Sequence, residues 1–195
     1  CARRINARSM SSRSSISKHT RSILPDPIQR EAYWRGAREL LPAAPGVFAW
    51  GLVTGVAMVK SGLSIEYALI MTFLAYAGSA QLAALPLLVT VAPLWVVALT
   101  AIAVNLRFVV YSAAMLPHLR HLPPSARVGL GYLIGDIGFA KFSALVEREP
   151  NYPHRVAYFA GGASCNWVLW QASSVIGILA ATTIPVEWGL ALAGT

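Results

Sequence analysis

The amino-acid sequence predicts an all-α fold, a polytopic integral membrane helical bundle of about five spans plus a truncated sixth, preceded by a basic N-terminal tail. Of the 195 residues, 56% are hydrophobic and 12% are charged, whereas soluble domains contain about 25% charged residues. The apolar residues fall in stretches of about twenty, the length that a helix needs to cross a hydrocarbon core roughly 30 Å thick. Because every backbone polar group must be satisfied inside lipid, stretches of this length favour helices over barrel strands.

The N-terminal segment carries most of the positive charge. Residues 1–42 hold nine Lys or Arg and three acids, which accounts for +6 of the net charge of +8. A basic segment before the first apolar stretch predicts a cytoplasmic N-terminus by the positive-inside rule. No aromatic residue interleaves with the basic ones before Tyr33, which argues against nucleic-acid binding. We therefore predict a basic, disordered tail over residues 1–31 and a membrane domain over residues 32–195.

The start of the tail allows more than one interpretation. Residues 1–25 are rich in Arg and Ser and contain no acid, which is typical of a transit peptide. A disordered cytoplasmic tail, or an over-extended gene start with Met10 as one initiator, explains the same composition, and we favour this interpretation. Because the chain does not begin with Met, we expect its true start to be missing or processed.

The first half of the membrane domain contains two apolar stretches. The first span is predicted over residues 43–59. Ser64 then has the side chain of a helix N-cap, and a second apolar stretch covers residues 67–91. Polar residues at 77–81 and Pro86 interrupt this second stretch, so it is either one tilted helix or two half-helices around a polar break. We favour a full span.

Three further spans follow, at residues 93–116, 128–146 and 156–181. The last stretch, residues 184–195, is too short to cross the bilayer as a helix, so we expect the chain to be C-terminally incomplete. The loops at 118–127 and 147–155 contain two Arg each, so counting charges does not orient the bundle. If residues 67–91 cross the membrane fully, the loop at 147–155 is cytoplasmic. If they follow a re-entrant path, the loop at 118–127 is cytoplasmic.

Two opposite charges stand near the middle of neighbouring predicted spans. Arg107 lies close to the midpoint of the third span, and Asp136 lies close to the centre of the fourth. Leaving both charges unpaired costs on the order of 5–7 kcal/mol, as the sum of about 2.5–3.5 kcal/mol for each, so we predict that they pair in some state. Arg107 either binds an anionic substrate group, or pairs structurally with Asp136, or lies less deep than this assignment implies. Asp136 is a proton carrier, the partner of a substrate ammonium, or the counter-ion of Arg107.

Other polar side chains lie near these charges in the sequence. Asn105 adds an amide beside Arg107, but residues two apart on a helix diverge by about 200°, so the two side chains cannot face one partner. Gly78, Ser79 and Gln81 interrupt the second stretch, and an unwound helix there exposes backbone groups that can coordinate a polar solute. The alternative for Gln81 is an interhelical hydrogen bond worth about 1 kcal/mol.

The remaining features point to packing and exclude other classes of protein. The polar and aromatic side chains of the fifth span are expected to pack and to form interhelical hydrogen bonds: Asn166, Trp167, Trp170 and Gln171. The four His lie in loops or the tail without ligand spacing, and there are two Cys, so we predict neither a metal site nor a cofactor. No GxSxG or HExxH motif occurs, and no span contains a His to act as a base, so we predict that the protein is not an enzyme.

Four short motifs carry a family resemblance: LPAAPG at 41–46, AGSAQ at 77–81, NLR at 105–107, and Asp136 with Phe139-Ala140. With these motifs the chain resembles the AzlC-like branched-chain amino-acid permeases over residues 32–195. The resemblance implies export of branched-chain or related neutral amino acids across a bacterial inner membrane, with a small AzlD-like membrane subunit as partner. Ile137 stands where the family often has a second acid, so the resemblance carries no two-carboxylate role to this chain. The family also usually continues beyond this C-terminus.

These observations combine into one hypothesis for the site and one alternative. In the hypothesis Arg107 attracts the substrate carboxylate, Asp136 receives the substrate ammonium or a coupling proton, and residues 78–81 supply backbone and amide contacts. Asn105 belongs to this group as the neighbour of Arg107. In the alternative the protein is a non-transporting membrane subunit, and the Arg/Asp pair only stabilises helix packing.

Overall fold

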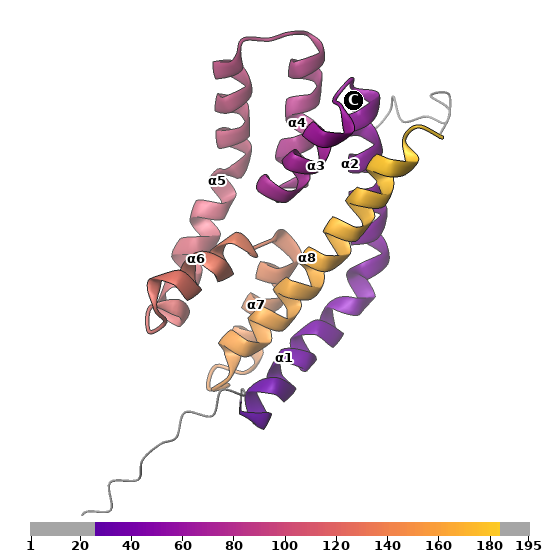
Figure 1. The fold of residues 1–195 in the computed structure, drawn as a ribbon. Coiled ribbons are helices and arrows are strands. Elements are labelled where there is room, and N and C mark those ends of the chain that lie inside the picture. Colours follow the sequence, from indigo (N-terminus) through magenta and orange to yellow (C-terminus); the bar gives the residue numbers. More distant parts are fainter. Residues whose placement is uncertain (1–25, 184–195) are drawn as a thin grey trace, which may run out of the picture.

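The described part of the chain is helical throughout. A computed structural model describes residues 26–183, and within that range it contains helices and no strand (Figure 1). The predicted all-α fold is confirmed, whereas residues 1–25 of the expected tail and the short stretch 184–195 lie outside the described residues. In chain order the elements are α1 (Pro27–Leu40), the 3₁₀ turn η1 (Leu41–Ala43), α2 (Ala44–Lys60), α3 (Ile65–Leu74), α4 (Gly78–Val89), α5 (Leu94–Leu119), α6 (Pro124–Tyr132), α7 (Asp136–Arg148) and α8 (Arg155–Ala180).

The first helix, α1, precedes the first predicted span at residues 43–59 and was not predicted from the sequence. The carboxylate of Asp26 accepts a hydrogen bond from the amide of Ile28 at 3.3 Å, and Pro27 occupies the first helical position, which suits its fixed φ. Residues 27–31, which we had assigned to the tail, therefore form the first turn of α1. Together α1, η1 and α2 make a helical run of 34 residues.

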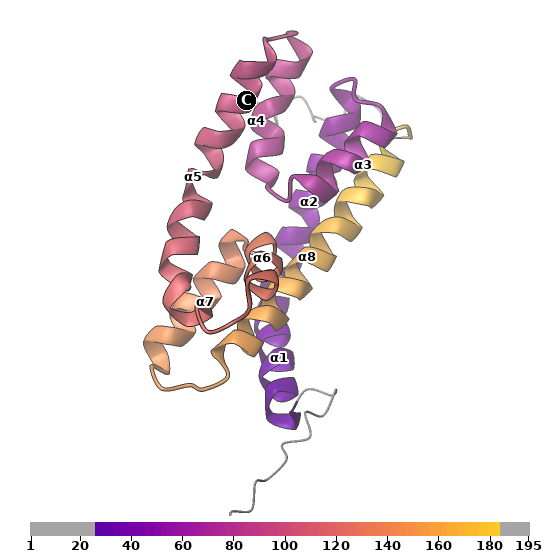
Figure 2. The same cartoon turned by 60° about the vertical axis from the view of Figure 1, so that its left-hand side comes forward.

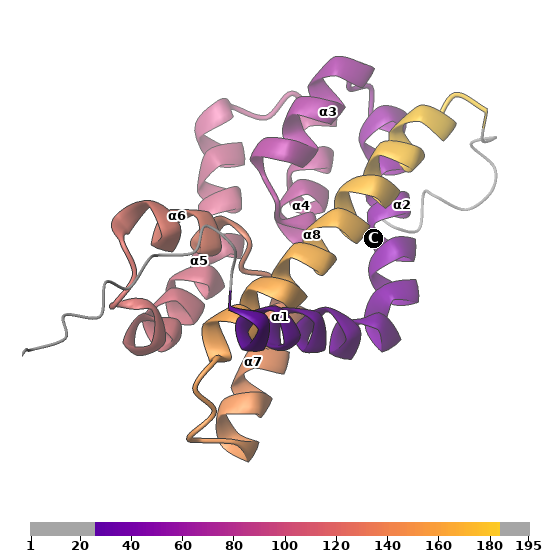
Figure 3. The same cartoon turned by 60° about the horizontal axis from the view of Figure 1, so that its bottom comes forward.

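α8 is the central helix of the bundle. It contacts α1, α2, α3, α5 and α7, and Figure 3 shows it crossing beside α2 and α3. Its close approach to α2 depends on small residues, because a β-carbon on Gly55 would overlap the carbonyl oxygen of Ser174. Gly51 and Gly55 form a GxxxG pair, the spacing that lets two helix backbones approach closely in a membrane.

The second apolar stretch forms two half-helices, α3 and α4, separated by the non-helical residues 75–77. In Figures 1 and 2 the α2–α3 and α4–α5 connections lie at the same end of the bundle, and the break lies near its middle. The stretch is therefore re-entrant, and the full span that we favoured is wrong. Gln81 holds the break together, because its side-chain amide donates to the carbonyl oxygens of Met71 (3.3 Å) and Ala75 (2.7 Å).

The predicted fourth span is wrong as a single helix. Residues 128–146 are divided between α6 and α7, which are bent by 116°. Gly135 is extended between them, with φ −131° and ψ 162°, and a hydrogen bond from the Ile134 amide to the Gly131 carbonyl (3.2 Å) ends α6. Because the side chains stay largely apolar through the break, hydropathy did not reveal it. Asp136 is consequently the first residue of α7 and not the centre of a helix.

The two halves of the bundle repeat one order of elements. After α2 come a four-residue connection (61–64), α3, a three-residue break (75–77) and α4. After α5 come a four-residue connection (120–123), α6, a three-residue break (133–135) and α7. The first pair enters from one end of the bundle and the second pair from the opposite end (Figure 1). This is the arrangement of an inverted repeat, in which broken helices meet near the middle of the membrane.

The re-entrant paths also change the placement of the loops. The α5–α6 and α7–α8 connections both lie at the end of the bundle where α1 begins (Figures 1 and 2). The sequence alone placed them on opposite sides, because it treated residues 128–146 as a full crossing. Since α6 and α7 turn back, both Arg-containing loops share one side.

The number of spans differs from the prediction of about five. Two helical runs among the described residues are long and apolar enough to cross a membrane, Pro27–Lys60 and Leu94–Leu119. By length and composition the bent pair of α6 and α7 is either one broken span or a re-entrant loop, and its turn back toward the end where it starts favours the re-entrant loop. α3 and α4 are apolar but shorter than a span. The predicted membrane character is thus supported, whereas the predicted span count is not confirmed.

Candidate functional site

A cavity of about 330 Å³ lies where the two helix breaks meet. Its walls come from α2, α4, α5, α7 and α8 as well as from both breaks. Four of the six predicted site residues line it: Gly78, Ser79, Arg107 and Asp136. The structure thus brings together residues from the first break, from α5 and from the second break, which the sequence separates by up to 58 positions.

Arg107 and Asp136 pair inside this cavity. The Nη1 atom of Arg107 lies 3.3 Å from Oδ2 of Asp136, and its Nη2 donates to the hydroxyl of Ser79. The hydroxyl of Tyr111, one turn after Arg107, donates to the other carboxylate oxygen of Asp136 at 3.0 Å. The predicted pairing is confirmed. One-third of the Arg107 side chain and half of the Asp136 side chain remain exposed, so the pair is open to the cavity.

Two half-helices begin at the cavity. α4 begins at Gly78 and α7 begins at Asp136, and neither N-cap residue makes a capping hydrogen bond with a side chain. The amides of Gly78, Ser79 and Ala80 have no acceptor among the described residues. A helix N-terminus carries roughly half a positive charge from such amides. Asp136 offsets this charge at α7, whereas α4 has no acid in its first turn.

The other two predicted site residues do not line the cavity. Asn105 lies two residues before Arg107 in α5, and its Oδ1 is buried without a hydrogen-bond partner. This placement agrees with the divergence that helical geometry predicts for the pair. Gln81 is fully buried, and its amide bonds to the end of α3, which resembles the structural alternative.

Two residues of α8 contribute to the cavity although the sequence suggested packing roles for them. Asn166 and Trp170 line the cavity, and each is 7% exposed. Within residues 26–183, the Oδ1 atom of Asn166 and the Nε1 atom of Trp170 have no hydrogen-bond partner. Their spacing of four residues, which puts both on one helix face, was the available signal. Gln171 next to them does pack as expected, because its amide donates to the Thr72 carbonyl at 3.0 Å.

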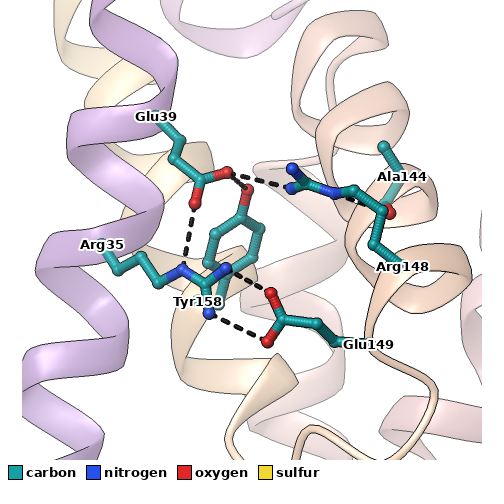
Figure 4. A network of polar contacts seen from close by, with 6 residues as sticks. All are labelled: Arg35, Glu39, Ala144, Arg148, Glu149 and Tyr158. Carbon is teal, nitrogen blue, oxygen red and sulfur yellow. Dashed lines mark hydrogen bonds and ion pairs between the residues drawn. The ribbon is translucent and has the colours of Figure 1, made fainter.

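A second polar cluster joins α1 to the end of α7 and the start of α8, and Figure 4 shows its side chains. Arg35 donates to Glu39 (3.0 Å) within α1 and makes a two-pronged contact with Glu149, one bond of which is 3.1 Å long. Glu39 also accepts from Arg148 (3.5 Å) and from the hydroxyl of Tyr158 (2.6 Å). The hydrogen bonds from Arg35 hold the pKa of Glu149 below its ordinary value. The spacing of Arg35 and Glu39 by four residues was the one available signal for this cluster, because the other partners lie more than 100 positions away.

The described residues contain no group of three His, Cys, Asp or Glu side chains that could hold a metal ion. The lining of the cavity includes aromatic and aliphatic side chains as well as the charged pair. Among the described residues that line it, Arg107 and Asp136 are the charged ones, so their formal charges sum to zero. A cavity with this lining can offer hydrogen bonds and apolar contact to a small polar solute.

Comparison with known proteins yields a family and a distant relative. A sequence model of the family described as AzlC protein matches residues 42–184. The inner membrane protein YgaZ of Escherichia coli (strain K12) is 25% identical over 158 residues, which are 80% of this chain and 64% of that protein. The chain therefore spans slightly less than two thirds of the length of this relative. No solved structure matches the chain.

Proposed function

Since the chain belongs to the AzlC family, we propose that it is a transporter, and not an enzyme, that exports branched-chain or related neutral amino acids from the bacterial cytoplasm. The family and the inner-membrane relative support a role in membrane transport. The observation that carries the proposal furthest is the cavity, because it lies between the N-termini of two half-helices, α4 and α7, which extend from the middle of the bundle toward opposite ends. Transporters with inverted repeats bind their substrates at such a junction.

The charges of the cavity favour a neutral zwitterion as substrate. Arg107 and Asp136 already compensate each other, so a solute with a net charge would leave an uncompensated charge inside the bundle. An α-amino acid carries one carboxylate and one ammonium, and the pair can exchange its mutual contact for contacts with both groups. In this proposal Arg107 attracts the carboxylate, and Asp136 receives the ammonium or a coupling proton.

The apolar part of the lining favours an aliphatic side chain. Val47, Phe108 and Ile137 line the cavity beside the charged pair. The volume of about 330 Å³ is at the lower end of the range for small-molecule sites. Burial of each methylene contributes about 0.8 kcal/mol to binding. Apolar burial alone can therefore make the site bind a leucine-sized solute more tightly than a smaller one.

The arginine-containing end of the bundle is proposed to face the cytoplasm of a bacterial cell, with the bundle in the inner membrane. Four arginines lie in or beside the two connections at this end: Arg120, Arg127, Arg148 and Arg155. Near the opposite end, Lys60 is the only Lys or Arg among the described residues. By the positive-inside rule this asymmetry favours a cytoplasmic N-terminus.

We also propose a small AzlD-like membrane subunit as partner, as the family resemblance implies. α5 has several large apolar side chains exposed along its length, among them Leu99, Ile102 and Val109. Such a helix face is suited to contact with lipid or with another membrane helix.

One observation favours the alternative of a non-transporting subunit. The Arg107–Asp136 pair is already formed without a solute, as expected if the two charges only hold α5 and α7 together. In that case the cavity is a by-product of the two breaks.

Leucine efflux from cells distinguishes these functions. The proposal predicts that wild-type protein exports radiolabelled leucine, and that Arg107→Gln and Asp136→Asn variants, inserted at normal levels, lose export. Arg127→Gln, which removes an arginine outside the cavity, is the matched control and should export normally. Normal export by both cavity variants contradicts the proposal.

The charge-swapped double variant Arg107→Asp with Asp136→Arg separates a substrate site from a structural pair. Restored assembly together with restored efflux favours a structural pair. Restored assembly without efflux favours a substrate site. A panel of amino acids in the same efflux assay identifies the preferred substrate.

A further inference from the structure

We infer that Asn166 and Trp170 bind the substrate directly and fix its orientation, with the carboxylate at the start of α4 and the ammonium at the start of α7. This inference rests on the proposed function and adds residues to its site. It starts from two buried polar atoms without a hydrogen-bond partner among the described residues, Asn166 Oδ1 and Trp170 Nε1, which belong to side chains that line the cavity. A buried polar atom without a partner is costly, so its retention calls for a ligand or another compensation.

The start of α4 is surrounded by hydrogen-bond donors. A β-carbon on Gly78 would overlap Cη2 and Cζ2 of the Trp170 indole, whose Nε1 is two bonds from Cζ2, and it would lie 3.0 Å from Nε1 of Trp50. Two indole N–H groups therefore lie close to the first turn of α4, where the amides of Gly78, Ser79 and Ala80 are also without acceptors. An indole nitrogen can only donate a hydrogen bond. Donors without acceptors, at the positive end of a helix, form a site for a carboxylate.

The start of α7 is surrounded by acceptors. Asn166 donates through Nδ2 to the hydroxyl of Tyr76, which leaves its Oδ1 free. The amide lies beside Gly135, where an added β-carbon would be 3.1 Å from Nδ2, so it sits directly next to the first residue of α7. That residue is Asp136, whose carboxylate oxygens lie at the same cavity wall. An ammonium group has three donors and no acceptor, so Asn166 Oδ1 and Asp136 are suited to it.

α8 sets the distance between these two ends. Asn166 and Trp170 are four residues apart on one helix, which separates them by about 6 Å along the axis and keeps both on one face. Each touches a different break, Asn166 at Gly135 and Trp170 at Gly78. One α-amino acid between the breaks can therefore reach both side chains. Such a site favours α-amino acids over amines or carboxylic acids, which satisfy one end and leave the other without a partner.

Binding of three ligands to the purified full chain tests this orientation. The ligands are leucine, leucinol (which lacks the carboxylate) and 4-methylpentanoate (which lacks the ammonium), and calorimetry gives their Kd values. Trp170→Phe should weaken leucine and 4-methylpentanoate by about tenfold or more and leave leucinol unchanged, because it removes a hydrogen bond to a charged group. Asn166→Leu should weaken leucine and leucinol and leave 4-methylpentanoate unchanged. Trp167→Phe, whose indole bonds to Tyr132 (3.2 Å) and does not line the cavity, is the matched control.

The outcomes separate this inference from the proposed function. If the wild-type protein binds leucine and a folded Trp170→Phe or Asn166→Leu variant binds it with the same Kd, the inference is overturned and the proposed function stands. The same holds if a variant weakens the binding of all three ligands equally. A wild-type protein that binds none of the three overturns both. If Asn166→Leu does not fold, Asn166→Asp replaces it: this variant keeps an acceptor, so it should retain leucinol and lose affinity for 4-methylpentanoate, and the reverse result overturns the inference.

Discussion

The Arg107–Asp136 pair makes a quantitative prediction about stability. At the observed separation of 3.3 Å and an effective dielectric constant of about 20, Coulomb's law gives about 5 kcal/mol. One-third of Arg107 and half of Asp136 are exposed, and exposed pairs contribute only about 0.2–1 kcal/mol. We therefore expect a coupling energy between these limits, about 1–3 kcal/mol.

A double-mutant cycle measures this coupling. Arg107→Gln and Asp136→Asn should each lower the free energy of unfolding, because each leaves one charge without its partner in the bundle. The double variant should be little less stable than either single variant. The assay is unfolding of the purified chain in detergent, followed by circular dichroism over a denaturant titration.

Additive effects, within about 0.5 kcal/mol, would refute this account of the pair. The control cycle combines Arg107→Gln with Lys141→Gln, since Lys141 lies on α7 but forms no ion pair among the described residues. That cycle should be additive.

Two further predictions concern the frame around the site. Gly55→Leu should destabilise the bundle by about 1–3 kcal/mol in the same unfolding assay, because its side chain would overlap the Ser174 carbonyl, whereas Gly129→Leu, which meets no neighbour, should not. The contact between Arg35 and Glu149 should be lost at low pH. Because the pKa of Glu149 is lowered in the folded state, the contact contributes its full stability above the ordinary glutamate pKa of about 4.3. That contribution is lost as the pH falls through the lowered pKa. The Glu149→Gln variant lacks this contribution at every pH, so it should lose less stability than the wild-type protein on acidification.

Local signals in the sequence located α2, α5, α8 and the start of α3, whereas they missed α1 and merged α6 with α7. The predicted span at residues 43–59 coincides with α2, and the predicted cap at Ser64 accepts a hydrogen bond from the Tyr67 amide at 3.4 Å. Hydropathy also located α5 and α8 as helices, because a long apolar stretch with polar ends has few alternatives to a helix. Of these two helices, α5 is long and apolar enough for a membrane span, whereas α8 is not among the candidate spans. The pairing of Arg107 with Asp136 followed from the cost of an isolated charge.

The local signals in the sequence did not predict where the chain turns back at the helix breaks, nor which distant residues come into contact. The break before Asp136 contains the apolar residues Leu133 and Ile134, so the hydropathy pattern does not separate α6 from α7. The contact of Arg35 with Glu149 joins residues 114 positions apart, and helix-surface spacing predicts only neighbours three or four apart. Asn166 and Trp170 look like packing residues until the two breaks are placed against α8.

The central claim is that the cavity between the two breaks holds the substrate. Ile137 lines this cavity, so an Ile137→Cys variant in a background without other cysteines (Cys1→Ser and Cys165→Ser) reports on its occupancy. Val110→Cys, on the exposed face of α5, is the control. The account predicts that leucine slows alkylation of the cysteine at 137 by a thiol reagent and leaves the cysteine at 110 unaffected. Equal alkylation rates with and without leucine at position 137, in a protein that transports leucine, would contradict it.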